Sequence, residues 1–311
     1  MLKVAFRVDI SNEIGTGHYM RMSVLSEAFT ELGCRCVFFK SADEPVDYSG
    51  FDIVVLDTYQ ISDAYISSLR TPGRILVCYD DNALYTYDCD ILLNANFHAN
   101  ELSFRFAGES PVLLLGAKYA LLRQEFRKVQ PITIREKAKR IFICFGGSDL
   151  QNFTPFAVRA LQEIPGVCLT VVLGAYTACD TEDALMNANV EVIKSPPSLC
   201  DVMVRCDIAV TAAGSMVYEL ASLGLPAIVI TQADNQNLIA KYLQRNKMMR
   251  WVGSWSDANP ELLRQETISL LNDPIRRKTE AQLLTQKVNR NGAVEAAKVI
   301  LKMKGDLWRI F

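Results

Sequence analysis

The first chemically distinctive stretch of the chain is a glycine-rich segment with a histidine and an arginine, Ile14-Gly15-Thr16-Gly17-His18-Tyr19-Met20-Arg21. It follows the apolar run Lys3–Asp9 and precedes apolar residues at helical spacing, so it predicts a turn from a strand into a helix. Glycines let backbone N–H groups approach an anion, and the helix dipole favours negative charge there. His18 could take a proton near neutral pH. Considered alone, the stretch is equally compatible with a tight turn that holds a half-exposed histidine.

The spacing of this turn differs from two common nucleotide-binding motifs. It is not Gly-x-Gly-x-x-Gly, because Tyr19 and Met20 run directly on to Arg21. No Gly-Lys-Ser/Thr follows it, as a P-loop requires. The turn is therefore neither a dinucleotide fingerprint nor a P-loop.

A second glycine turn, Gly214-Ser215, opens a predicted helix in the other half of the chain. Its hydroxyl and backbone N–H groups suit a diphosphate, and the carboxylate of Glu219, one turn further along, suits ribose hydroxyls. Asn235 and Gln236 begin the next predicted helix and could hydrogen-bond hydroxyl or amide groups of a sugar. Singly, Ser215 could be a helix N-cap and Glu219 a surface charge. Their order and spacing together favour the binding interpretation.

Length, composition and charge favour a globular protein of two domains. The 311 residues suffice for domains of about 150 residues each, and 50% of them are hydrophobic. A net charge of −2 argues against nucleic acid or an anionic membrane surface as the main partner. The first residues include Arg7 and Asp9 and predict neither a signal peptide nor a spanning helix. No apolar run approaches the roughly 18 residues that a membrane helix needs.

The nine cysteines are scattered through predicted strands and loops. This distribution indicates reduced thiols in a cytoplasmic protein. Cys34 with Cys36, and Cys200 with Cys206, lack metal-ligand spacing, and the chain has only two histidines. We therefore expect no metal and no disulfide framework.

The elements that must position these residues alternate between strand-like and helix-like segments in both halves. Continuous β-branched and leucine runs separated by helices predict parallel sheets covered on both faces, an α/β architecture. The expected strands are Lys3–Asp9, Cys34–Phe39, Phe51–Asp57, Arg74–Tyr79, Asp90–Asn94, Val112–Leu115, Ile141–Phe145, Val167–Gly174, Val190–Ile193, Asp207–Thr211 and Ala227–Ile230. The expected helices include Asp63–Arg70, Met216–Leu223 and most of Glu261–Lys304. Two doubly wound, Rossmann-like halves predict a ligand in the cleft between them.

A change in amino-acid composition between the two halves sets the expected domain boundaries. From Arg123 to Arg140 the chain is charged and contains Pro131. Its basic cluster is typical of a solvated linker and consists of Arg135, Lys137, Lys139 and Arg140. We expect an N-terminal domain over 1–128, a linker over 129–140 and a C-terminal domain over 141–292. A helix over 293–311 is expected to pack back on the N-terminal domain.

Several motifs together resemble those of a known family. They are Phe6-Arg7-Val8-Asp9 with the Gly15-to-Arg21 turn, Asp57-Thr58-Tyr59, Asp80-Asp81, Cys89–Asn94, Leu115–Phe126, Phe145–Asp149, Ala213-Gly214-Ser215 with Glu219, Leu223–Pro226 and Asn235-Gln236. Over nearly the whole chain, the sequence resembles the UDP-2,4-diacetamido-2,4,6-trideoxy-β-L-altropyranose hydrolases of pseudaminic acid biosynthesis. These enzymes are relatives of the MurG glycosyltransferases and have a GT-B fold. Thr58 departs from the family, which usually has histidine or serine at this position.

The resemblance implies roles for individual residues. His18 would be the catalytic base that activates water. The substrate-binding residues would be Gly15, Gly17, Arg21, Tyr59, Asn235 and Gln236. The UDP-binding residues would be Gly147, Ser148, Ile193, Gly214, Ser215 and Glu219. Because the GT-B architecture is the metal-free one and Asp90 leads into a predicted strand, Asp88-Cys89-Asp90 is not expected to bind metal. His98, in a polar stretch, is expected to be structural or solvent-facing.

The implied reaction is hydrolysis of a UDP-sugar to UDP and free sugar, with inversion at the anomeric carbon. UDP is a good leaving group that needs charge stabilisation more than a general acid, whereas water needs a base. A glycosyltransferase shares the fold, the UDP site and the glycine turn, and it remains an alternative. A non-catalytic nucleotide-sugar sensor or assembly partner would bind without turnover and would not need His18. We expect a cytoplasmic monomer that uses no cofactor and acts on a small-molecule UDP-sugar.

Overall fold

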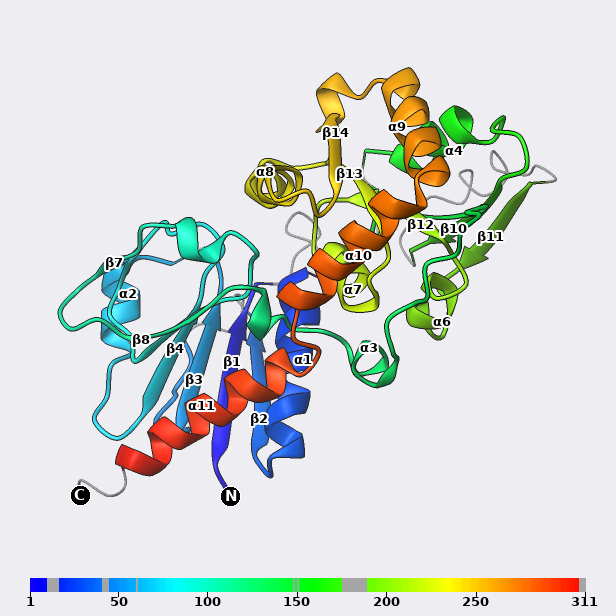
Figure 1. Cartoon of the computed structure of the whole chain (residues 1–311). Helices are drawn as coiled ribbons and strands as arrows, with labels where there is room; N and C mark the ends of the chain where they lie inside the picture. The colour runs from blue at the N-terminus through cyan, green and yellow to red at the C-terminus, as the bar shows by residue number, and fades with distance from the viewer. Residues whose placement is uncertain are drawn as a thin grey trace. The chain divides into compact units, whose positions relative to one another are not determined.

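The computed structural model describes residues 1–9, 17–40, 45–59, 61–147, 149, 151–174 and 189–307 of the 311-residue chain. The chain divides into two compact units, and each is described by itself (Figure 1). The first unit comprises Met1–Gln124 and Asn289–Phe311, and the second comprises Glu125–Val288. Both divisions fall a few residues before the boundaries expected from the sequence.

The first unit is built on a six-stranded parallel sheet. Its strands, in spatial order, are β2 (Arg35–Lys40), β1 (Lys3–Val8), β3 (Ile53–Asp57), β4 (Ile75–Tyr79), β6 (Ile91–Asn94) and β8 (Val112–Leu115). Every residue of β3, β4 and β6 is buried, because β-branched and leucine side chains pack on both faces of a covered sheet. The other elements of its N-terminal part are α1 (Gly17–Glu31), α2 (Asp63–Ser68), the pair β5 (Thr86–Tyr87) and β7 (Arg105–Phe106), and short 3₁₀ helices at Ala99–Glu101 and Ala117–Tyr119.

The C-terminal helix α11 (Gly292–Leu307) belongs to the first unit and packs against α1. Its buried apolar residues join the core of the N-terminal sheet, and they are Ala293, Ala296, Ala297 and Ile300. Lys304, on the same helix, is buried and donates to the carbonyl oxygen of Gly73. Its Nζ also lies 3.4 Å from Oδ1 of Asp52. The helix therefore returns the end of the chain to the sheet on which the chain begins (Figure 1).

The second unit has a second six-stranded parallel sheet. Its strands, in spatial order, are β11 (Val190–Lys194), β10 (Cys168–Leu173), β9 (Arg140–Cys144), β12 (Ile208–Ala212), β13 (Ala227–Thr231) and β14 (Arg250–Ser254). Its helices are α4 (Phe153–Leu161), α6 (Leu199–Met203), α7 (Met216–Leu223), α8 (Asn237–Arg245), α9 (Pro260–Asn272) and α10 (Pro274–Lys287), with α3 (Gln124–Lys128) at the boundary. The chain runs from β9 outward to β11 and then returns to β12 on the other side of β9, as in a Rossmann sheet. The two sheets confirm the expected α/β class with two Rossmann-like domains.

The segment 129–140, expected to be a solvated linker, is part of the second unit. Nη1 of Arg135 donates to Oδ1 of Asp207 at 2.6 Å, and Oδ2 of Asp207 accepts the backbone N–H groups of Lys139 and Arg140. Burial raises the pKa of Asp207, but these donors outweigh burial and lower that pKa below its ordinary value. The basic segment is therefore tied to the second sheet, because a partly buried carboxylate needs donors and this segment supplies them.

Smaller differences concern short elements. The structure adds β5, β7 and β14, whose short or glycine-containing segments carry a weak apolar pattern. The helix expected from Asn235 begins as a 3₁₀ turn, Asp234–Gln236, and becomes α8 at Asn237. Within the described ranges, no helix is long and apolar enough to cross a membrane, and the eight cysteines present there are free.

Candidate functional site

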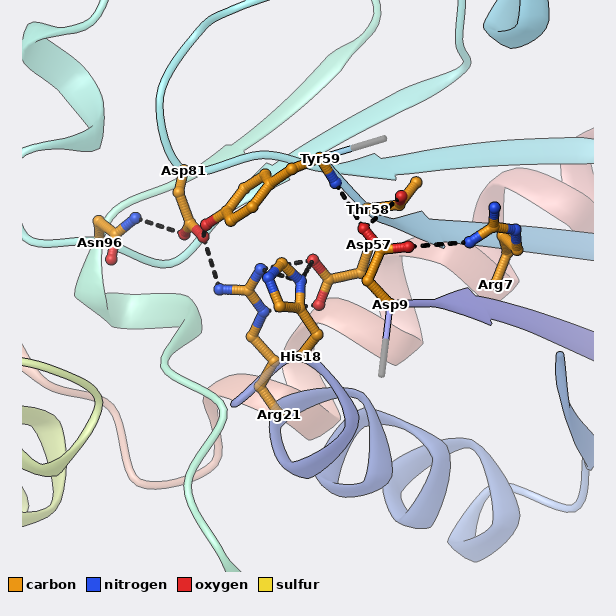
Figure 2. A network of polar contacts seen from close by, with 9 residues as sticks. All are labelled: Arg7, Asp9, His18, Arg21, Asp57, Thr58, Tyr59, Asp81 and Asn96. Carbon is orange, nitrogen blue, oxygen red and sulfur yellow. Dashed lines mark hydrogen bonds and ion pairs between the residues drawn. The ribbon is translucent and has the colours of Figure 1, made fainter. Parts of the chain in front are cut away.

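A network of polar side chains lies at the carboxyl ends of the strands of the first sheet (Figure 2). The strand order reverses between β1 and β3, which is where doubly wound sheets bind ligands. Asp9 directly follows β1, Asp57 ends β3, and the N–H of Asp9 donates to the carbonyl of Asp57 at 3.3 Å. The helix α1 begins at Gly17, while Gly15 lies outside the described residues.

His18 and Asp57 form a buried pair at this edge. Nδ1 of His18 lies 2.7 Å from Oδ1 of Asp57, and the two residues are 5% and 1% exposed. Nδ1 also lies 3.0 Å from Nη2 of Arg21, which can only donate a hydrogen bond. In the tautomer in which Nδ1 donates to Asp57, Nε2 has the free lone pair. The ring also packs edge-on against Tyr59, with centroids 4.5 Å apart and planes at 84°. In this geometry a histidine can act as a general base while a carboxylate orients it.

Arg21, one turn further along α1, joins Asp57 to a second carboxylate. Its Nε donates to Oδ2 of Asp57 at 2.6 Å, and its Nη2 donates to Oδ1 of the same residue. Its Nη1 donates to Oδ2 of Asp81 at 2.6 Å, and its guanidinium lies over the Tyr79 ring. Burial lowers the pKa of Arg21, but the two carboxylates outweigh burial and raise it, so the guanidinium keeps its charge. The expected contact of Arg21 with substrate stays a prediction.

Asp81 accepts hydrogen bonds from three separate segments. Besides Arg21, its donors are the phenolic O–H of Tyr59 at 2.6 Å and Nδ2 of Asn96 at 2.8 Å (Figure 2). Burial raises the pKa of Asp81, but these three donors outweigh burial and lower it, so Asp81 is ionised. Burial and the charge of Asp81 together raise the pKa of Tyr59. Tyr59 therefore remains a neutral phenol beside the imidazole of His18.

Asp9 fixes the segment that carries Tyr59. This fully buried carboxylate accepts from the hydroxyl of Thr58 at 2.6 Å, from the backbone N–H of Tyr59 at 2.8 Å and from Nη1 of Arg7 at 3.1 Å. Thr58, the residue that departs from the resembling family, is buried and directs its hydroxyl to this carboxylate. The residue type at position 58 therefore affects the hydrogen bonds that hold the backbone of Tyr59 in place.

In the second unit, the strand order reverses between β9 and β12, and glycines follow the strands there. Gly147 lies just beyond β9, and Gly174 lies just beyond β10. A Cβ on Gly174 would lie 2.2 Å from the carbonyl oxygen of Gly147. Gly214 lies just beyond β12, and Nε2 of Gln236 lies 3.6 Å from the position that a Cβ on Gly214 would occupy. The structure thus brings Gly214 and Gln236 together, and it leaves no room for a side chain at Gly174.

Gln232 and Asp149 orient Gln236 at this edge. The backbone N–H of Gln232 donates to Oε1 of Gln236 at 2.8 Å, which leaves Nε2 of Gln236 on the side of Gly214. Nε2 of Gln232 donates to Oδ1 of Asp149 at 3.1 Å, and the same oxygen accepts the N–H of Phe153 at the start of α4. The amide of Gln236 is therefore held in one orientation by a chain of hydrogen bonds.

The other predicted residues of the second unit are spread over three elements. Ser215 is exposed immediately before α7, and its side chain makes no capping hydrogen bond with a described residue, so the structure does not support a merely capping role. Glu219 is half-buried in the first turn of α7, and Asn235 is exposed in the 3₁₀ turn. Ile193 lies on β11 at the sheet edge, beyond β10. Ser148 lies outside the described residues.

Asp88, Asp90 and His98 were not expected to bind metal or to act in catalysis, and their contacts and burial agree with structural roles. Nε of Arg70 lies 3.3 Å from Asp88, and Nη1 of Arg70 donates to Asp90. Oδ2 of Asp90 also accepts the N–H of Leu76 at 2.7 Å. His98 is 3% exposed, which excludes the solvent-facing alternative, and burial lowers its pKa. Among the residues that the structure describes, no group of three or more histidine, cysteine or acidic side chains could hold a metal ion.

The carboxylates that organise the first site received no role in the sequence analysis. They are Asp9, Asp57 and Asp81, and the amide of Asn96 belongs with them. Their positions carried a usable signal, because each follows or ends a predicted strand. The carboxyl ends of parallel strands meet at one edge, so polar residues at those positions are candidates for a shared site.

Residues 143–300, half of the chain, match the family model of the glycosyltransferase family 28 C-terminal domain. The chain belongs to this family. Among solved structures, MurG of Acinetobacter baumannii is similar to the family 28 chain with a TM-score of 0.66 at 15% identity, over 96% of this chain and 99% of MurG. The fold of the family 28 chain is therefore GT-B, as the sequence predicts.

Two curated proteins are similar in sequence to the family 28 chain. It is 26% identical over 276 residues to the UDP-2,4-diacetamido-2,4,6-trideoxy-β-L-altropyranose hydrolase of Campylobacter jejuni, a match covering 78% of this chain and 97% of that enzyme. It is 27% identical over 280 residues to an uncharacterized protein of Methanocaldococcus jannaschii. That match covers 76% of this chain but only 57% of the length of the archaeal protein.

Proposed function

We propose that this family 28 protein hydrolyses a UDP-diacetamido-trideoxy-hexose to UDP and the free sugar. The observation that carries the proposal is the buried contact of 2.7 Å between Nδ1 of His18 and Oδ1 of Asp57. In the proposed mechanism Nδ1 donates to this carboxylate, and Nε2 is the basic atom. The Campylobacter jejuni relative, matched over 97% of its length, supports the substrate class. The place in pseudaminic acid biosynthesis is what the family resemblance implies.

The proposed reaction needs one base and one good leaving group. Nε2 of His18 takes a proton from water while the water oxygen attacks the anomeric carbon. The bond between that carbon and the diphosphate oxygen breaks, and UDP leaves with the electron pair. The free sugar is released with inverted anomeric configuration. Asp57 stabilises the imidazolium that forms, as carboxylates paired with catalytic histidines do.

We assign the UDP part of the substrate to the second unit. The N-terminus of α7, preceded by Gly214 and Ser215, offers backbone N–H groups and an exposed hydroxyl to the diphosphate. Glu219, in the first turn of the same helix, would accept hydrogen bonds from the ribose. The oriented amide of Gln236 beside Gly214 would donate to the sugar or to the diphosphate.

A second candidate is transfer of the sugar to an acceptor hydroxyl. The family and the MurG-like fold favour it, and the same pair of His18 and Asp57 would deprotonate a hydroxyl as readily as water. The two reactions differ in the nucleophile, so the products formed when water is the only nucleophile distinguish them. A nucleotide-sugar sensor would give no product at all.

The deciding experiment incubates the full chain with a panel of UDP-diacetamido-trideoxy-hexoses in H₂¹⁸O without an acceptor. Proton and phosphorus NMR then identify the products. Hydrolysis by the proposed route gives UDP without ¹⁸O and a free sugar of inverted configuration. Release of UDP only after an acceptor is added would establish the transferase instead. Binding without turnover in either case would overturn both enzymatic proposals, and His18→Asn serves as the control for contaminating hydrolases.

A further inference from the structure

A second polar cluster lies in the second unit, away from the edge that carries the predicted UDP-binding residues. A cavity of about 400 Å³ lies between the end of α8, the start of β14, α9 and α10. The lining residues that matter here are Lys247, Arg250, Glu266, Arg276, Thr279 and Glu280. Arg250 is the first residue of β14, whereas Gly147 and Gly214 lie beyond the carboxyl ends of β9 and β12. The cavity therefore lies at the opposite edge of the same sheet.

Two arginines and two glutamates alternate along the cavity. Nη2 of Arg250 lies 3.0 Å from Oε1 of Glu266, whose Oε2 lies 3.7 Å from Nη1 of Arg276. Nε of Arg276 donates to Oε1 of Glu280 at 2.8 Å. Among the described residues, one buried polar atom at each end of this row has no partner: Nε of Arg250 and Oε2 of Glu280. Since buried polar atoms are normally paired, these two leave the hydrogen bonding of the row incomplete beside the cavity.

The chemistry of these two atoms selects an anion. Three cationic side chains and two carboxyl groups line the cavity, so its charge is positive. Nε of Arg250 can only donate a hydrogen bond. Burial raises the pKa of Glu280 to about 7, and its protonated carboxyl can also donate. An oxyanion accepts from both donors, whereas a cation would face Lys247, Arg250 and Arg276.

The charged groups that face Glu280 come from all sides of the cavity. They are Arg276 on its own helix, Asp273 before that helix, Glu266 on α9, Arg250 on β14 and Lys247 after α8. The helix α7 also packs on α10, but its single charged residue, Glu219, does not line the cavity. Ionisation of Glu280 therefore adds a negative charge directly at the place where an anion would bind.

We propose that this cavity is a second ligand site, which binds an oxyanionic group, phosphate or carboxylate, on Arg250, Lys247 and Glu280. The hydroxyl of Thr279 adds another donor to the wall. The volume is large enough for a small metabolite that carries such a group, because ligand pockets begin near 300 Å³. Binding takes up a proton on Glu280, since the ionised carboxylate repels the ligand.

The test is an NMR titration of the full chain labelled with ¹⁵N, with UDP present to occupy the proposed nucleotide site. Sulfate is the probe for a tetrahedral oxyanion, because its charge is constant between pH 6 and pH 8, and acetate is the probe for a carboxylate. The expected result is a saturable shift of the backbone amides of Lys247, Arg250 and Thr279. Because Glu280 changes charge in this range, Kd should be about tenfold lower at pH 6 than at pH 8. The probe that binds more tightly identifies the ligand class.

Three variants make the test specific. Arg250→Met is expected to weaken sulfate binding at least about tenfold, as loss of a charged hydrogen bond does. Glu280→Gln keeps a donor in place of the protonated carboxyl, so it should bind equally at both pH values. Lys278→Met is the matched control, because Lys278 lies on the same helix but pairs with Glu136 and does not line the cavity.

The proposal fails if neither probe shifts these amides at either pH. It also fails if Glu280→Gln retains the pH dependence, or if Lys278→Met weakens binding as much as Arg250→Met. Glu280→Gln preserves the shape of the side chain, so it decides the question even where Arg250→Met does not fold. None of these outcomes depends on whether the protein is a hydrolase or a transferase.

Discussion

The phenolic hydroxyl of Tyr59 donates to Oδ2 of Asp81 across 2.6 Å, although the two residues follow different strands of the first sheet. Asp81 also accepts from Arg21, and Arg21 donates to Asp57, the carboxylate that orients His18. The contact therefore links the ring that packs against His18, through Arg21, to the carboxylate that contacts Nδ1 of His18. Loss of one member of this network should therefore disturb both contacts of His18, with the Tyr59 ring and with Asp57.

His18→Asn is expected to lower kcat about 10²–10⁴-fold, the range for loss of a general base, and to leave UDP affinity nearly unchanged. The reason is that Nε2 of His18 is the proposed proton acceptor, while the UDP contacts are assigned to the other unit. Steady-state kinetics and calorimetry with UDP measure the two effects separately. A kcat within about threefold of the wild-type value would remove His18 from the mechanism.

Asp81→Asn is expected to lower the free energy of unfolding near neutral pH by about 1.5–3 kcal/mol, the contribution of hydrogen bonds to a charged group. The pKa of Asp81 is lowered in the folded protein, so its ionised form stabilises the fold above the unfolded pKa of about 3.9. This contribution is lost as the pH falls through the folded pKa.

Urea unfolding of the wild type and the Asp81→Asn variant checks the sign of this effect. The difference in unfolding midpoint should be full between about pH 5 and pH 7 and should shrink below about pH 4. A difference that grows on acidification would contradict the assignment of Asp81 as an ionised acceptor.

Turnover is expected to persist in EDTA. Helix N-termini can hold a diphosphate without a metal, and Asp88 and Asp90 are already engaged by Arg70. The measurement is the rate of UDP release before and after chelation. Loss of turnover that Mg²⁺ or Mn²⁺ restores would return these two carboxylates to consideration as metal ligands.

Glu219→Ala is expected to weaken the affinity for UDP and for the UDP-sugar together, by about 1.5–3 kcal/mol for a lost hydrogen bond to a charged group. The chemical step should change much less, because ribose contacts are the same in the ground and transition states. The His18 and Glu219 variants should therefore fail in opposite ways, the first in kcat and the second in KM.

Calorimetry with UDP decides the role of Glu219. Glu261→Ala is the matched control, because Glu261 also lies in the first turn of a helix of the same unit and is exposed. Equal UDP affinity in the Glu219→Ala variant and the wild type would mean that the carboxylate faces solvent, and the nucleotide would need a different placement.

Local sequence patterns predicted most of the elements that position the site. The strand Val112–Leu115 and the helix Met216–Leu223 have the bounds expected from the sequence, and the buried strands β3 and β4 differ from expectation only at their first residues. Burial on both faces of a strand and the apolar spacing of a helix are properties of consecutive residues. Such elements can therefore be recognised without knowing what lies next to them.

The sequence pointed to His18 by its residue type and to Tyr59 through the family resemblance, but only the tertiary structure gave them partners. His18 pairs with a carboxylate 39 residues away, and Arg21 pairs with Asp81, 60 residues away. The segment 129–140 looked like a linker for the same reason, since its partner Asp207 is 72 residues from Arg135. Spacing along the chain determines which residues share a strand or a helix face, whereas ion pairs between distant residues depend on which strands lie side by side in the folded sheet.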